Sequence, residues 1–293
     1  MRVAFQGVQG AYSEVALRAH FGNKAEPLSC AFSEEVFDAV ASGEAQRGFL
    51  PIENSIAGPV AVNADLFAEC KVFVTAEAYL RIEHCLLAPK GTRLDAVTAV
   101  YSHPVALAQC RDFLKKRDLK AVPEYDTAGA AKLVAARRVL GEAAIASTSC
   151  AEAYGLEILA KNIQSVADNF TRFWAFVKGS RPPAGLKMEK TSVVFTAGHR
   201  PGALLECLRR FADHKINLTR LESRPLPSNP FEYSFHADFL GGARDPGVLL
   251  ALRELARDAH RVKVLGSYPV GARPRSVRSV SSQPRHASVT ETP

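Results

Sequence analysis

Five consecutive residues near the middle of the chain, Asn169-Phe170-Thr171-Arg172-Phe173, place a hydroxyl beside a guanidinium between two Phe residues. A guanidinium presents a planar fork of donors that matches a carboxylate, and it stays charged at physiological pH. Among aromatic rings, its attraction for an anion is screened less than at an exposed site. The stretch therefore predicts a site for a small anionic substrate. The same residues also fit an ordinary strand whose Arg forms a surface ion pair.

Small polar residues also gather in four loops, at 6–13, 51–55, 102–104 and 126–129. The loops lie next to predicted strands and helices. In open α/β sheets, ligands bind beyond the carboxyl ends of strands, where helix N-termini present unpaired amides. Each loop taken separately is also an ordinary turn with a capping hydroxyl. His103 is a candidate general acid or base, and it also fits a helix cap. Glu53 is the candidate catalytic carboxylate of the first lobe, although it could instead only orient its loop. No Gly-x-Ser-x-Gly element or nucleophile with an adjacent base is present, so covalent hydrolysis is unsupported.

The elements that must position these residues follow an α/β pattern from residue 3 to residue 177, in which short apolar runs alternate with amphipathic stretches. Pro104 suits the first turn of a helix, which needs no amide hydrogen there. Asp126 and Thr127 form a capping signal for another helix. We predict strands at 3–5, 48–50, 99–101 and 143–146, and helices at 13–21, 34–41, 104–116 and 128–138.

A segment rich in Gly, Pro and Lys, at 178–187, interrupts this pattern and predicts a linker. The following residues predict strand 191–196, helix 202–214, strands 218–223 and 233–239, helix 246–259 and strand 262–265. This βαββαβ order is typical of the ferredoxin-like unit. Residues 272–293 have too little apolar content to fold, and we expect them to form a disordered basic tail.

The composition excludes several classes of protein. The net charge is +7, but the tail after Gly271 supplies three of these charges, and no basic stripe interleaved with aromatics predicts nucleic-acid binding. The six Cys residues include no Cys-x-x-Cys pair, which favours reduced thiols and no metal site. No cofactor motif is present. There is no run of eighteen apolar residues and no signal-peptide pattern, so we expect a cytoplasmic protein without a membrane span.

Together, four segments resemble the prephenate dehydratase family: 7–13, 51–55, 169–173 and 216–225, the last containing Glu222-Ser223-Arg224-Pro225. The resemblance covers residues 2–269, in the same order and at similar separations. It implies an α/β fold with a two-lobed, periplasmic-binding-protein-like catalytic domain, followed by a ferredoxin-like βαββαβ ACT domain. The implied boundaries are 1–178 for the catalytic domain, with lobe one at 1–80 and 170–178 and lobe two at 81–169. A linker at 179–189, the ACT domain at 190–270 and the tail at 271–293 follow.

The resemblance implies conversion of prephenate to phenylpyruvate with loss of water and carbon dioxide, without a cofactor or metal. By resemblance, Thr171 assists the leaving hydroxyl and Arg172 holds a carboxylate. The chain is expected to cross between lobes near 78–87 and 164–172. Further residues expected at the substrate are Asn54, Ser55, Ser102, Thr127, Ser147 and Phe173.

Three other segments, at 84–88, 126–131 and 265–269, resemble plant arogenate dehydratases equally well. Arogenate carries an amino group where prephenate has a keto oxygen, so the substrate stays open between these two. The family also implies a dimer or tetramer with feedback inhibition by L-phenylalanine. The residues expected at the effector are Gly202, Ala203, Leu204, Asn217, Glu222, Ser223, Arg224 and Pro225. Two other classes remain: a non-catalytic amino-acid-binding protein with the same two lobes, and a regulatory protein built on the ACT domain.

Overall fold

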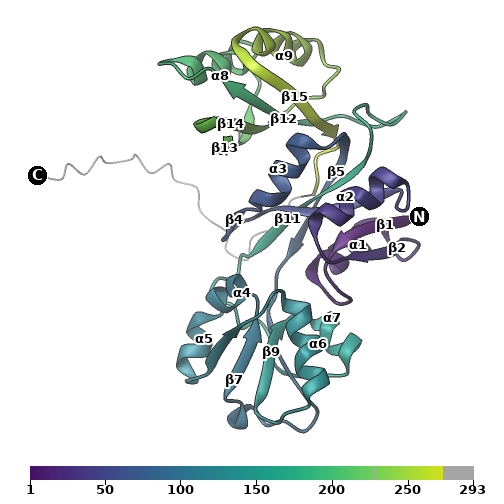
Figure 1. The fold of residues 1–293 in the computed structure, drawn as a ribbon, viewed down its shortest axis with the longest axis vertical. Helices are drawn as coiled ribbons and strands as arrows, with labels where there is room; N and C mark the ends of the chain where they lie inside the picture. The colour runs from purple at the N-terminus through teal and green to yellow at the C-terminus, as the bar shows by residue number, and fades with distance from the viewer. Residues whose placement is uncertain (227–228, 273–293) are drawn as a thin grey trace, which may run out of the picture.

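The computed structural model describes residues 1–226 and 229–272. Three units follow one another along the long axis of the molecule (Figure 1). Lobe one lies in the middle, lobe two lies at one end, and the βαββαβ unit lies at the other. The predicted fold class, two α/β lobes followed by a ferredoxin-like unit, is confirmed.

Lobe one is a mixed sheet with strand order β5-β11-β3-β1-β2. Strand β11, which follows lobe two in the chain, therefore returns to lie between two strands that precede lobe two. Strand β11 is antiparallel to both β3 and β5, while β1 is parallel to β2 and β3. Side chains alternate across the sheet, so Phe49 and Phe173 pack on the α1 face, whereas Leu50 and Trp174 pack on the α2 and α3 face. The elements are β1 (Arg2–Gln6), α1 (Tyr12–Phe21), β2 (Glu26–Cys30), α2 (Ser33–Ser42), β3 (Arg47–Asn54), β4 (Gly58–Pro59), α3 (Ala61–Glu69), β5 (Val72–Arg81) and β11 (Phe170–Lys178).

Lobe two has a separate sheet of order β10-β6-β9-β7-β8. The single helix predicted at 104–116 is wrong, because Cys110 leaves helical geometry (φ −106°, ψ 14°) and divides it into α4 and α5. The chain passes between the lobes at 82–84 and again at 161–169, close to the expected crossings. The elements are β6 (Cys85–Ala88), η1 (Leu94–Ala96), β7 (Ala99–Ser102), α4 (Pro104–Gln109), α5 (Arg111–Lys116), β8 (Lys120–Pro123), α6 (Thr127–Arg137), β9 (Glu142–Ala146), α7 (Thr148–Tyr154) and β10 (Glu157–Ala160).

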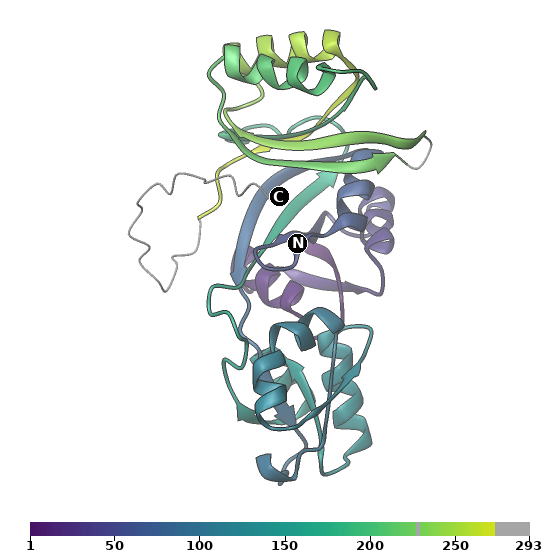
Figure 2. The same ribbon diagram turned by 90° about the vertical axis from the view of Figure 1, so that its left-hand side faces the viewer.

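The βαββαβ unit has strand order β13-β14-β12-β15, and α8 and α9 cover the face of its sheet that points away from lobe one (Figure 2). Strand β15 pairs with β5 at Gly266 and Val74, which joins this sheet to that of lobe one. A Cβ at Gly266 would lie 2.3 Å from the Val74 carbonyl oxygen, so only glycine allows this approach. The elements are β12 (Lys190–Ala197), α8 (Ala203–Asp213), β13 (Leu218–Leu226), β14 (Asn229–Leu240), α9 (Pro246–Asp258) and β15 (Ala259–Tyr268).

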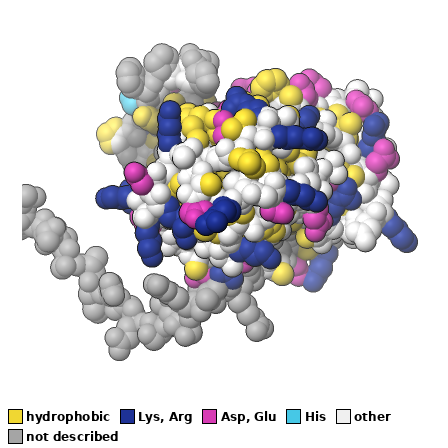
Figure 3. Space-filling view, turned by 90° about the horizontal axis from the view of Figure 1, so that it is seen from below, with side chains coloured by type: hydrophobic (Ala, Val, Ile, Leu, Met, Phe, Trp, Pro, Cys, Tyr) yellow, Lys and Arg dark blue, Asp and Glu magenta, His cyan; other side chains and the backbone are white. Residues whose placement is uncertain are grey.

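The surface at the lobe-two end mixes Lys and Arg with Asp and Glu side chains, as Figure 3 shows. No helix within 1–226 and 229–272 is long and apolar enough to cross a membrane. The tail predicted at 271–293 lies outside the described residues from residue 273 onward.

Candidate active site

A cleft of about 600 Å³ lies between the two lobes. Its lobe-one wall comes from the loop before α1, the end of β3, the segment 57–62 that follows β3, and the start of β11. Its lobe-two wall comes from the starts of α4 and α6. The polar residues that line it include Tyr12, Ser13, Asn54 and Thr171 from lobe one, His84 from the first crossing, and His103, Gln109, Asp126 and Thr127 from lobe two.

Strand alternation explains why Thr171 and Phe173 face this cleft. Both residues lie on one face of β11, and Thr171 is directly opposite Asn54 of β3 in the antiparallel register. The ring of Phe173 stacks on Phe49, with centroids 5.1 Å apart and planes 4° from parallel. The stacked pair of Phe49 and Phe173 therefore fixes the position of β11 against β3. The Thr171 side chain projects into the cleft on the same face of β11.

The Asn54 amide sets the direction of the hydrogen bond to Thr171. Its Oδ1 accepts from the backbone amides of Ile56 (3.0 Å) and Ala57 (2.8 Å), which can only donate. Its Nδ2 therefore donates to Thr171 Oγ1 at 3.0 Å and to Asn169 Oδ1 at 2.8 Å. No other group in the described chain contacts Thr171 Oγ1 by a hydrogen bond. The hydroxyl of Thr171 thus keeps its own hydrogen for a group in the cleft.

The same chain of hydrogen bonds continues to His84. Asn169 Nδ2 donates to Gln109 Oε1 at 3.0 Å, and this oxygen also contacts His84 Nε2 at 2.8 Å. His84 must donate through Nε2, because the oxygen can only accept. Burial lowers the pKa of His84 although its bond to Gln109 opposes this, so the ring is neutral near pH 7. Its Nδ1 faces the Tyr12 hydroxyl at 2.9 Å, and the single hydrogen of that hydroxyl lies between Nδ1 and the Glu83 carbonyl oxygen, which is 2.8 Å from the hydroxyl.

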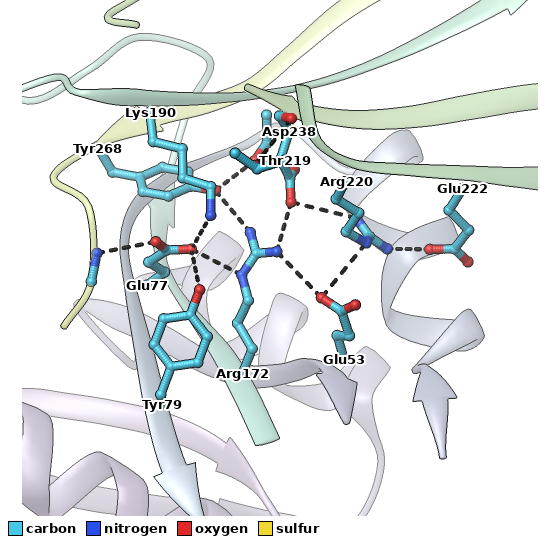
Figure 4. Close-up of polar contacts among 12 residues, drawn as sticks. Glu53, Glu77, Tyr79, Arg172, Lys190, Thr219, Arg220, Glu222, Asp238 and Tyr268 are labelled. Carbon is cyan, nitrogen blue, oxygen red and sulfur yellow. Dashed lines mark hydrogen bonds and ion pairs between the residues drawn. The ribbon is translucent and has the colours of Figure 1, made fainter. Parts of the chain in front are cut away.

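Arg172 occupies the opposite face of β11, which contradicts its expected place beside Thr171 in the cleft. Its guanidinium donates to Asp238 Oδ2 at 2.6 Å and to the Tyr268 hydroxyl at 3.2 Å, and its Nε lies 2.9 Å from Glu77 Oε2 (Figure 4). It is only 5% exposed. The physical reason is the period of a strand: consecutive side chains point to opposite faces.

Arg172 belongs to a buried ion cluster of three cations and four carboxylates that joins lobe one to the βαββαβ unit (Figure 4). Lys190 lies 2.8 Å from Glu77, and Arg220 pairs with Glu222. Glu53 lies 3.4 Å from Arg172, so the carboxylate candidate of the first lobe also faces away from the cleft. The members are Glu53, Glu77, Arg172, Lys190, Arg220, Glu222 and Asp238.

Of the residues expected at the substrate, Asn54, Thr127 and Phe173 line the cleft, and three Ser residues do not. Ser102 is fully buried and donates to the Ile145 carbonyl at 2.6 Å. Ser147 caps α7 and donates to the Gly10 carbonyl at 2.6 Å. Ser55 accepts from the Phe170 amide at 2.9 Å and so ties the loop after β3 to the start of β11. These hydroxyls are satisfied by backbone groups, which makes their roles structural.

The residues expected at the effector form two separate groups within one chain. Leu204 lines a hollow of about 300 Å³ with His199, Arg200 and Tyr233, next to Gly202 and Ala203 at the start of α8. Arg224 instead pairs with Asp65 of lobe one at 2.7 Å. Asn217 precedes β13, and Glu222, Ser223 and Pro225 lie on it, none of them at this hollow.

Tyr12, His84 and Gln109 are site residues that the sequence reasoning did not select. Tyr12 stands in the first polar loop, so its position carried a signal. His84 lies in the segment 84–88, whose resemblance to plant arogenate dehydratases gave none of its residues a role in the site. Gln109 is the last residue of α4 and lines the cleft, but no motif in the sequence singled it out. Within the described chain, no group of three or more His, Cys, Asp or Glu residues is arranged to hold a metal ion.

Comparisons with known proteins find prephenate and arogenate dehydratases, together with a structure described as an acylase. A family model described as prephenate dehydratase matches residues 3–181. The Arabidopsis thaliana protein described as arogenate dehydratase/prephenate dehydratase 2, chloroplastic, is 41% identical over 279 residues, covering 92% of this chain and 73% of that protein. The structure of a prephenate dehydratase from Arthrobacter aurescens in complex with L-Phe is 32% identical, with a TM-score of 0.83 over 92% of this chain and 89% of that one. A structure described as GqqA, a novel type of quorum quenching acylase, is 35% identical, with the same TM-score over 92% of this chain and 98% of its own.

Proposed function

This chain belongs to the prephenate dehydratase family, and we propose that it converts prephenate to phenylpyruvate in L-phenylalanine biosynthesis. The observation that carries the proposal is the Thr171 hydroxyl, which Asn54 leaves as a donor toward the cleft. Thr171 is therefore the proposed catalytic residue. Asn54, Thr127 and Phe173 are the proposed substrate contacts.

The reaction needs a hydrogen-bond donor at one oxygen. The bond from the ring to its carboxylate breaks, carbon dioxide leaves, and the electrons enter the ring, which becomes aromatic. The ring hydroxyl leaves with its bonding electrons and takes up one proton to become water. A Thr hydroxyl is too weak an acid to be ionised near neutral pH, so Thr171 hydrogen-bonds the departing oxygen or relays a proton to it.

The substrate carboxylates need donors other than Arg172. Among the described residues, none that lines the cleft is Lys or Arg. Helices α1 and α6 both begin at the cleft, with Tyr12, Ser13 and Thr127 on its wall. First-turn amides have no partner within their helix and carry partial positive charge. We infer that these helix starts on opposite lobes bind the two carboxylates.

A parallel assay tests the function. Purified protein is incubated with prephenate, arogenate or an acyl-amide substrate, and phenylpyruvate, L-phenylalanine and free amine are measured. We expect phenylpyruvate to form from prephenate. L-Phenylalanine from arogenate would support the alternative substrate of the same reaction. If neither compound were consumed but an amino acid bound between the lobes, the chain would be a binding protein and the enzyme proposal would be wrong.

We further infer that L-phenylalanine inhibits this chain through an ACT domain at 190–270. Support comes from the relative crystallised with L-Phe and from ion pairs between the βαββαβ unit and lobe one, two of which are formed by β13 and β14. Arg224 of β13 pairs with Asp65 of α3, and Asp238 of β14 pairs with Arg172 of β11. Since Arg172 adjoins Thr171, a shift of β14 would act directly on the strand that carries the catalytic hydroxyl.

The regulatory proposal has its own measurement. Coupling between two sites usually changes affinity by about fivefold or more, so millimolar L-phenylalanine should lower turnover at subsaturating prephenate by about that factor. It should also raise the thermal midpoint through binding. If neither quantity changed, the proposal would fail, while the dehydratase activity would stand.

The separation of the two effector groups favours a site completed by a second copy of the chain. We propose a homodimer or homotetramer in the cytoplasm, with residues 202–204 of one copy near residues 222–225 of another. Size-exclusion chromatography with light scattering measures the mass. A monomer that still responds to L-phenylalanine would contradict the shared site.

A further inference from the structure

The cleft has an unusual balance of charge for a site that binds dianions. Among the described residues that line it, Asp126 is the one with a formal charge at neutral pH, and none is Lys or Arg. His103 on the same wall does not compensate, because burial lowers its pKa even though Asp126 opposes that shift. His84 is neutral for the same reason. The charged side chain in the cleft is therefore a carboxylate.

Asp126 has one oxygen to spare. As the N-cap of α6, it accepts from the Gly129 amide through Oδ1 at 2.6 Å. A cap uses a single oxygen. Within the described residues, no hydrogen bond reaches its Oδ2, and the side chain is partly exposed at the cleft. The capping bond fixes the carboxylate in place, and the second oxygen remains available to a ligand.

The positions of Asp126 and Thr171 match the two ends of the substrate. The leaving hydroxyl and the three-carbon side chain are attached to opposite carbons of the six-membered ring. A residue that contacts the hydroxyl and one that contacts the side chain must therefore face each other across the cleft. Thr171 comes from lobe one and Asp126 from lobe two, as this requires.

Resting on the proposed function, we propose that Asp126 discriminates between the two forms of that side chain. A carboxylate attracts the positively charged ammonium of arogenate. It cannot form a hydrogen bond with the keto oxygen of prephenate, because both groups are acceptors. Asp126 therefore raises kcat/KM for arogenate relative to prephenate. Its neutral neighbours, His103 and Thr127, leave this preference uncancelled.

The test is Asp126→Asn, which keeps an oxygen for the Gly129 amide and removes the charge. We expect kcat/KM for arogenate to fall by about tenfold or more, with prephenate unchanged or improved. Asp126→Ser, which also caps a helix, should shift the ratio in the same direction. Asp112→Asn is the matched control, because its carboxylate is 71% exposed on α5 outside the cleft.

Two results would overturn the assignment: an unchanged ratio of the two kcat/KM values in both variants, including an equal fall for both substrates, or a wild type that turns over prephenate but not arogenate. An equal fall would mean that Asp126 acts through the helix cap. The thermal midpoint, expected to stay unchanged, checks that the cap survives. A wild-type protein that consumed neither compound would instead refute the proposed function.

Discussion

Thr171 and Arg172 are adjacent in β11 but lie in two regions built on different physics. The cleft around Thr171 is held by neutral amides, an imidazole and hydroxyls. The region around Arg172 is a buried cluster of charges between lobe one and the βαββαβ unit. One step along a strand therefore separates a hydroxyl that is available to a ligand from a guanidinium that is already paired.

The difference shows what each arrangement can do. Hydrogen bonds from neutral groups orient Thr171 and leave its hydroxyl hydrogen free, so the hydroxyl can still donate to a ligand in the cleft. In the cluster, burial is the largest influence on Arg172 and opposes its charge, but Asp238, Tyr268 and Glu77 together outweigh burial and hold the Arg172 pKa above its usual range. Burial likewise raises the pKa of Asp238, yet Arg172 and Arg220 bring it below the ordinary value. Charges that stabilise each other in this way are not free to bind substrate.

The largest expected effect comes from breaking the charged region. Arg172→Gln leaves Asp238 buried without its main partner and Glu77 with Lys190 alone, which should lower the free energy of unfolding by about 3–5 kcal/mol. Urea denaturation at neutral pH measures the loss. Arg93→Gln is the control, because Arg93 is 80% exposed and pairs with Asp95 at the surface. A loss under 1 kcal/mol for Arg172→Gln would mean that the cluster does not depend on this residue.

A second effect separates the two regions by pH. His236 of β14 is 1% exposed, and within the described chain neither ring nitrogen has a hydrogen-bond partner. Burial, followed by Arg220, lowers the pKa of His236 from 6.5 to about 4. The unfolded chain therefore takes up this proton first, and stability falls as the pH drops from 6.5 to 4. The expected loss from this group is about 3 kcal/mol.

Comparing wild type with His236→Phe checks this sign. The free energy of unfolding is measured at pH 7.0 and pH 4.5, and the variant should lose less stability between them. The lowered pKa of Asp238 acts below pH 4, so it does not mask the comparison. Identical losses in both proteins would show that His236 is not the acid-sensitive group.

Much of this arrangement could be predicted from the sequence. The strand and helix order of the βαββαβ unit and the Asp126 cap follow from local patterns, whereas the position of Thr171 near a crossing between lobes followed from the family resemblance. Because side chains alternate along a strand, the sequence also indicated that Arg172 points away from Thr171. The motif nevertheless led us to assign both residues to one substrate site. When a motif lies on a strand, the alternation of side chains therefore decides which of its residues share a site, even for residues that are adjacent in the sequence.

The partners of Arg172 were not predictable in the same way. Asp238 stands 66 positions later, and only the docking of β14 on lobe one brings the two together. Glu222 and Arg224 stand two positions apart on β13, yet in the fold Arg224 pairs with Asp65 and Glu222 with Arg220. Ionic partners depend on which elements face each other, which local patterns do not contain.

The smallest expected effect concerns the hydroxyls that were expected in the cleft. Ser102→Ala removes one buried bond to the Ile145 carbonyl, which should cost about 1–2 kcal/mol of stability. Since Ser102 does not reach the cleft, kcat per folded molecule should equal that of wild type. If Ser102→Ala lowered turnover tenfold without changing stability, Ser102 would belong to the active site, and the division between the two regions would be wrong.

The central claim is that the Thr171 hydroxyl assists the departing oxygen, and turnover of Thr171→Val tests it most directly. Valine keeps the shape and the β-branch but cannot donate, and Asn54 still has Asn169 as an acceptor. We predict that kcat for prephenate falls at least about a hundredfold with little change in the thermal midpoint, whereas Thr171→Ser retains most of the activity. A Thr171→Val protein that turned over within about threefold of wild type would contradict the account.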